Sequence, residues 1–173
     1  MIDITEQLTT TNKRSAYLHK ASQIYQTLSS LDTRVILTVS NIQFKGSHNA
    51  FRLQVHLATA DDMDTELAYF NIYGNYIKAP FEKLTRITVP NYTPPAMNIN
   101  CEDYQGKHVS KMLILIAFHY AKQVYPRFNS TTELFIDTDA STIVGYDASC
   151  SKVSTGYEKR CLVEDLNAYL FRN

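Results

Sequence analysis

Apolar side chains near the start of the chain recur at steps of three and four residues, the spacing of one face of an α-helix. The pattern predicts an amphipathic helix that begins near Asn12, with Thr11 or Asn12 as its cap, and ends at Asp32-Thr33. Residues 1–11 are polar and are predicted to be a loose lead-in. The apolar positions of this helix are Leu18, Ala21, Ile24, Tyr25, Leu28 and Leu31.

Alternation with a period of two then replaces the helical spacing and predicts antiparallel strands. Val35, Leu37 and Val39 share one parity, and Ile42 and Phe44 share the other, so a bulge or bend is expected near Ser40-Asn41. Residues 51–57 alternate apolar side chains with Arg52, Gln54 and His56, which predicts a half-buried strand. A third strand is expected over Glu66–Tyr73, closed by Gly74-Asn75.

The second half of the chain is dominated by one helix that is apolar almost all round. It is expected to run from Gly106 to Tyr125 and to end at Pro126, and such a helix must be buried, against a sheet. The tail from Tyr157 to Phe171 mixes strand-like and helix-like patterns. Shorter strands are predicted at Leu84–Val89, Met97–Cys101 and Glu133–Asp137. The outline is one α+β domain over residues 1–173, with a mostly antiparallel mixed sheet around the buried helix.

Composition narrows the class of protein. The 173 residues are 45% hydrophobic, with 17 basic and 17 acidic side chains, which suits one folded domain and argues against disorder. A net charge of zero argues against a nucleic-acid partner, and the longest apolar run, Met112–Phe118, is too short to cross a membrane. Cys101, Cys150 and Cys161 are odd in number and lack metal-type spacing, so we expect reduced thiols in an intracellular protein and no metal site.

Candidate chemistry is concentrated in the segment Tyr104–Ile114, which places Gly106, Lys107 and Lys111 at the start of the predicted buried helix. Free N–H groups and the positive end of the helix dipole favour a phosphate at such a position. The two lysines, about one turn apart, would add charge on the same side. An ordinary helix start with solvated lysines is the competing interpretation.

This segment resembles the pyrophosphate-binding segment of the GNAT acetyltransferases, in which Gln or Arg precedes a glycine-rich turn into a helix. Leu134–Asp137 is similar to the strand that follows that helix, and Thr155–Arg160 resembles the family's later tyrosine-containing segment. The order of elements agrees as well, over about residues 13–165. Divergent proteins of this type occur in large DNA viruses, and a viral chain would act in the infected cell or virion.

The resemblance implies a GNAT-like fold and transfer of an acetyl group from acetyl-CoA to an amine on a small molecule or a protein. It implies that Tyr157 is the general acid that protonates the coenzyme thiolate. No base can be carried over from the family, and Glu66 on the central strands is the candidate for that role. The residues that would hold the cofactor are Gln105, Gly106, Lys107, His108, Val109, Ser110 and Lys111.

The sequence departs from the family pattern where small residues normally follow the glutamine. His108 and Ser110 stand at those positions, and Cys161 replaces the glycine after the tyrosine segment. The alternative is therefore a degenerate, non-catalytic GNAT-like fold that binds protein partners. Asp137 and Asp139 also resemble an Asp-x-Asp cation or phosphoryl-transfer site, although the 34 residues after Asp139 are too few for that kind of domain.

Overall fold

The computed structural model describes residues 1–10, 15–28, 32–43, 49–76, 85–88, 91–92, 107–124, 128–137, 152–153 and 158–172. The chain divides into two compact units, each assembled from separate stretches of sequence. The first unit contains Met1–Thr38, Gln54–Phe70 and Pro90–Tyr120. The second contains Val39–Leu53, Asn71–Val89 and Ala121–Asn173.

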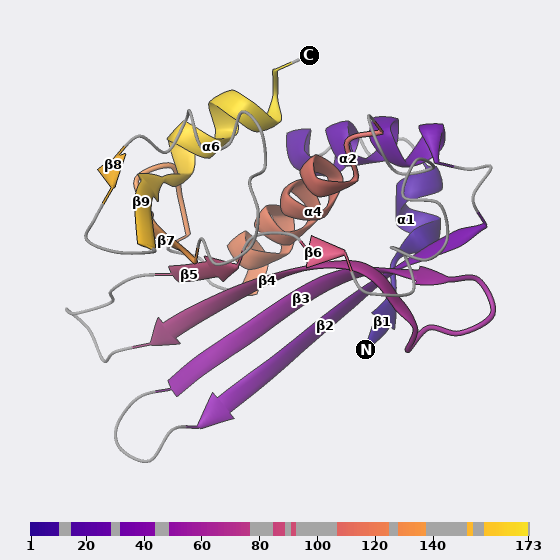
Figure 1. Cartoon of the computed structure of the whole chain (residues 1–173), viewed down its shortest axis with the longest axis horizontal. Helices are drawn as coiled ribbons and strands as arrows, with labels where there is room; N and C mark the ends of the chain where they lie inside the picture. Colours follow the sequence, from indigo (N-terminus) through magenta and orange to yellow (C-terminus); the bar gives the residue numbers. More distant parts are fainter. Residues whose placement is uncertain are drawn as a thin grey trace. The chain divides into compact units, whose positions relative to one another are not determined.

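The protein belongs to the α+β class, as the sequence predicts (Figure 1). Neighbouring strands follow the hydrogen-bonded order β1-β2-β3-β4-β5-β7-β9-β8, and β6 pairs with β4. The helices are α1 (Thr5–Thr9), α2 (Ala16–Thr27), α4 (Val109–Val124) and α6 (Val163–Leu170). The strands are β1 (Ile2–Asp3), β2 (Thr33–Gln43), β3 (Asn49–Thr59), β4 (Glu66–Tyr76), β5 (Thr85–Thr88), β6 (Asn91–Tyr92), β7 (Glu133–Asp137), β8 (Lys152–Val153) and β9 (Glu158–Leu162).

The sheet is mostly antiparallel. In Figure 1 the arrows of β2, β3 and β4 run in alternating directions. Among the strand pairs whose register is described, only β5 and β7 are parallel, with Thr85 opposite Leu134 and Thr88 opposite Asp137. The chain between these two strands contains α4, as a parallel pair requires a long connection. The predictions for β5 and β7 are confirmed, and the strand predicted at Met97–Cys101 lies outside the described residues.

The prediction of a loose lead-in was wrong for residues 1–10. Ile4 and Leu8 are buried, at 1% and 0% exposed, and α1 lies between β1 and α2 in the chain. The Ser22 hydroxyl on α2 donates to the Leu8 carbonyl over 2.7 Å. Two isolated apolar side chains were too few for the helical pattern to emerge from the sequence, but their burial and this bond hold α1 in place.

The prediction of a helix over residues 12–31 is confirmed in its centre and corrected at its ends. Ser15 caps α2, and its hydroxyl accepts from the Leu18 N–H over 3.3 Å, while the predicted caps Thr11 and Asn12 lie outside the described residues. The helix ends at Thr27 rather than at Asp32-Thr33. The Ser15 hydroxyl also lies 2.8 Å from His119 Nδ1 on α4, so one side chain connects the start of α2 with α4.

The apolar helix is buried as predicted, although it begins at Val109 rather than Gly106. Every side chain from Met112 to Phe118 is fully buried. Within the first unit, the rings of Phe118 and of Tyr17 on α2 pack in a T-shaped arrangement, with ring centroids 6.0 Å apart. This packing of α4 and α2 positions the start of α4 beside α2.

The middle of β3 is buried on both faces, which corrects the prediction of a half-buried strand. Gln54 is 8% exposed and His56 is 3% exposed. The Gln54 amide donates to Glu66 Oε1 over 2.8 Å, and His56 Nε2 lies 2.8 Å from the Met63 carbonyl oxygen. Polar side chains can be buried when the fold supplies such partners, and alternation in the sequence does not reveal those partners.

The second unit corrects two further predictions. β4 continues through Gly74-Asn75, where a turn was expected, because β5 pairs with it there and Gly74 lies opposite Thr85. The unassigned tail forms β9, which pairs with all of β7, and then α6. The N–H groups of Val163 and Glu164 at the start of α6 donate to the carbonyls of Thr132 and Ser130, at 3.0 and 2.9 Å.

Candidate site at the start of α4

The residue before α4 has a backbone conformation that favours glycine. His108 has φ of 58°, in the left-handed region, and its carbonyl accepts the N–H of Met112 over 3.0 Å. His108 is therefore the N-cap residue, since its carbonyl takes the first bond of the helix while its own φ is not helical. A side chain with a Cβ disfavours this conformation by about 1–2 kcal/mol.

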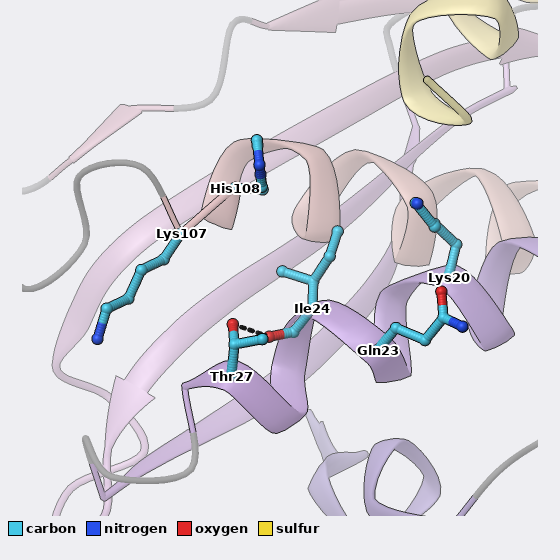
Figure 2. A pocket seen from close by; sticks show the side chains of 6 residues that line it. All are labelled: Lys20, Gln23, Ile24, Thr27, Lys107 and His108. Atoms are coloured by element: carbon cyan, nitrogen blue, oxygen red, sulfur yellow. Dashed lines mark hydrogen bonds between the residues drawn. The ribbon is translucent and has the colours of Figure 1, made fainter. Parts of the chain in front are cut away.

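A pocket of about 270 Å³ lies beside this helix start, within the first unit. In Figure 2, Ile24 extends from α2 toward the beginning of α4, and Lys107 and His108 point in different directions from the turn before α4. The Thr27 hydroxyl donates to the Ile24 carbonyl over 2.6 Å. The residues that line the pocket are Lys20, Gln23, Ile24, Thr27, Lys107 and His108.

The electrostatic character of the pocket suits an anion. Its six lining residues include two lysines and no carboxylate. The N–H groups of the first turn of α4 have no acceptors within the helix, and the helix dipole adds partial positive charge at the same end. A phosphate group is the kind of ligand that such an arrangement favours.

The structure brings together only part of the predicted cofactor segment. Lys107 is half-buried and His108 is exposed, and both line the pocket. Val109 is buried, and Ser110 lies in the first turn of α4. Lys111 is only 8% exposed, has a partner of its own and does not line the pocket. Gln105 and Gly106 lie outside the described residues.

Of the two residues predicted for proton transfer, the structure describes only Glu66. Tyr157 lies outside the described residues. Glu66 begins β4, where its Oε1 accepts from the Gln54 amide, and it is not among the residues that line the pocket. The described residues therefore form a candidate binding site, and the proton-transfer roles stay predictions.

The sequence interpretation missed the α2 side of the pocket. Lys20, Gln23, Ile24 and Thr27 are spaced at three- and four-residue steps, so they lie on one face of that helix. This spacing was visible in the sequence. Its pairing with the start of α4 was not, because it depends on the packing of two helices that are far apart in the chain.

In the part of the chain that the structure describes, no group of three or more His, Cys, Asp or Glu side chains could hold a metal ion. Among the helices of those same residues, none is both long and apolar enough to cross a membrane. No protein-family model matches the chain, and no curated protein matches it either.

Proposed function

We propose that this protein is an acyl-CoA-dependent N-acetyltransferase-like protein with a GNAT-like fold, and that the start of α4 binds the pyrophosphate of acetyl-CoA. The observation that carries the proposal is the left-handed backbone of His108 beside a lysine-lined pocket. The GNAT segment that this sequence resembles has small residues at this point. A glycine-type backbone there allows the N–H groups to approach a phosphate closely.

The topology supports the same proposal. One parallel strand pair, β5 and β7, interrupts a mostly antiparallel sheet. The buried helix α4 lies in the chain between those two strands, so the candidate phosphate site lies within their connection. A mixed sheet with a buried central helix is what the resemblance to the GNAT family implies.

The proposed reaction transfers an acetyl group from the sulfur of the coenzyme to the nitrogen of an amine. The amine nitrogen attacks the thioester carbonyl carbon, the C–N bond forms, the C–S bond breaks, and the amine loses a proton. We propose Tyr157 as the acid that protonates the coenzyme thiolate and Glu66 as the base that takes the amine proton. The Gln54 amide, 2.8 Å from Glu66 Oε1, would fix the orientation of that carboxylate.

A second candidate function is a non-catalytic domain that binds other proteins. The observation that favours it is the side chain of His108, which lines the pocket where a glycine would leave space. If the imidazole blocks the pyrophosphate, His108→Gly will bind acetyl-CoA while the wild-type chain does not. If the imidazole is accommodated, the wild-type chain will bind the coenzyme.

Calorimetric titration with acetyl-CoA tests the proposal. Lys107→Glu replaces a lysine of the pocket with a carboxylate, and we expect affinity to fall at least about tenfold, because an interaction with a charged group contributes roughly 1.5–3 kcal/mol. Lys111→Glu is less suitable, because a charge reversal at a buried side chain would also destabilise the fold.

Lys122→Glu is the matched control, since Lys122 is exposed in the last turn of the same helix and does not line the pocket. This variant should bind acetyl-CoA as the wild-type chain does. Equal affinity of the Lys107→Glu variant and wild type would exclude the start of α4 as the binding site. Absence of binding by both the wild-type chain and His108→Gly would refute a role for acetyl-CoA.

A further inference from the structure

The short strand β1 covers only part of one edge of β2. Ile2 and Asp3 lie opposite Leu37 and Ile36. The next contact along this edge is at Val35, whose carbonyl accepts from the Ile4 N–H and whose N–H donates to the Thr5 hydroxyl, each over 2.9 Å. Both backbone groups of Val35 therefore point toward the β1 side of β2.

Backbone direction repeats every second residue along a strand. The N–H and carbonyl groups of Val39, Asn41 and Gln43 therefore point to the same side as those of Val35. β1 does not extend along this part of β2, and no other described strand pairs with β2 on the β1 side. Unpaired backbone groups in such a row are a template for another strand.

This part of β2 also lacks two of the features that normally keep strand edges apart, namely charged side chains and prolines. Edge strands are usually protected by charged side chains, prolines or bulges. Residues 35–43 contain no charged residue and no proline. Val39 is a β-branched apolar residue with 42% of its surface exposed, one of the larger apolar exposures in the described part of the chain.

We propose that the β2 edge from Val39 to Gln43 pairs antiparallel with the same edge of a second copy of this chain. Antiparallel pairing of one strand with its own copy is an isologous contact around a twofold axis, and it needs no other surface. An uncharged edge meets its copy without like-charge repulsion. The chain as a whole has equal acidic and basic residues, so two copies do not repel one another through net charge either.

Sedimentation velocity over a series of protein concentrations tests this proposal. The wild-type chain should shift from monomer to dimer as concentration rises. In this pairing Asn41 lies on the twofold axis and Val39 lies opposite Gln43 of the copy, so Val39→Lys places one charge near each end of the contact and should raise the dissociation constant at least about tenfold, whereas Val39→Thr keeps the β-branched shape and should dimerise. Met63→Lys makes the same kind of change at a residue that is 40% exposed in the turn between β3 and β4, and it should dimerise like wild type.

Amide hydrogen exchange at low and high protein concentration locates the contact. Protection at Val39 and Asn41 should increase with concentration, and protection at Ser40 should stay constant because its N–H points toward β3. A wild-type chain that stays monomeric throughout would overturn the proposal. So would a dimer that Val39→Lys leaves equally tight, or one that forms without added protection at Val39.

Discussion

Replacing His108 with glycine should stabilise the protein, because the native backbone at this residue already has a conformation that glycine adopts readily. His108 has φ of 58° and caps a helix of 16 residues. Its carbonyl accepts the Met112 N–H over 3.0 Å, and glycine would keep that bond. Glycine is also well tolerated as an N-cap residue.

The expected gain is the difference between two opposing effects. The left-handed conformation costs a residue with a Cβ about 1–2 kcal/mol. Glycine costs roughly 0.5–1 kcal/mol more than other residues in the chain entropy lost on folding. The free energy of unfolding should therefore rise by about 0.5–1 kcal/mol. In a domain of this size, that gain corresponds to a rise in Tm of roughly 1–4 °C.

Thermal unfolding of the wild-type chain, His108→Gly and His108→Ala distinguishes the effect of the backbone conformation on stability from the effect of the imidazole side chain. Alanine keeps the Cβ, so His108→Ala should not have a higher Tm than wild type. Asp32→Gly provides a comparison, because Asp32 also has a positive φ, of 46°, but aspartate tolerates the left-handed region better than histidine. Its gain in Tm should be smaller than that of His108→Gly.

The reasoning would be refuted if His108→Gly melted at or below the temperature of the wild-type chain. It would also be refuted if His108→Ala matched His108→Gly, because the imidazole rather than the backbone would then limit stability. Titration of the same two variants with acetyl-CoA connects this result to function. A stabilised glycine variant that binds the coenzyme more tightly would mean that the histidine side chain obstructs the pocket.

Two further predictions concern stability. Leu8→Ala should lower the free energy of unfolding by about 2–5 kcal/mol in chemical denaturation, because Leu8 is fully buried; a change below 1 kcal/mol would mean that α1 does not belong to the cooperative core. The Asp62 carboxylate accepts hydrogen bonds from the Thr65 hydroxyl over 2.6 Å and from the Asp64 N–H over 2.9 Å. These bonds, with the Thr65 bond as the larger effect, hold the pKa of Asp62 below its usual value of 3.8. The stabilisation of the folded state by these bonds is therefore present above pH 3.8 and is lost as pH falls through the lowered pKa. Asp62→Asn should therefore reduce the loss of unfolding free energy at acidic pH. If the variant loses as much stability in acid as the wild-type chain does, these bonds are not the cause.

The fold class and most long elements could be predicted from the sequence, because burial of α2, β2 and α4 requires apolar side chains at many of their positions. Short elements could not. α1 depends on Leu8 and Ser22, and α6 depends on N–H groups bonded to the Ser130 and Thr132 carbonyls, so neither leaves a repeat in the sequence. Burial of Gln54 and His56 was also invisible, because it depends on partners in β4 and in the turn before it.

The sequence predicted only the α4 side of the candidate site. The sequence placed Lys107 and His108 at a helix start from the local succession of glycine, lysines and apolar residues. It could not identify Lys20 or Thr27, because their role depends on the position of α2 beside α4. It also assigned Lys111 to the ligand by spacing from Lys107, whereas Lys107 precedes the helix and Lys111 is buried within it.

The two proposals depend on different parts of the chain, so either can fail alone. The coenzyme proposal depends on His108 and Lys107 in the first unit, and the self-association proposal depends on the edge near Val39 in the second. If Val39→Lys is monomeric and binds acetyl-CoA as wild type does, pairing at β2 is separate from the pocket.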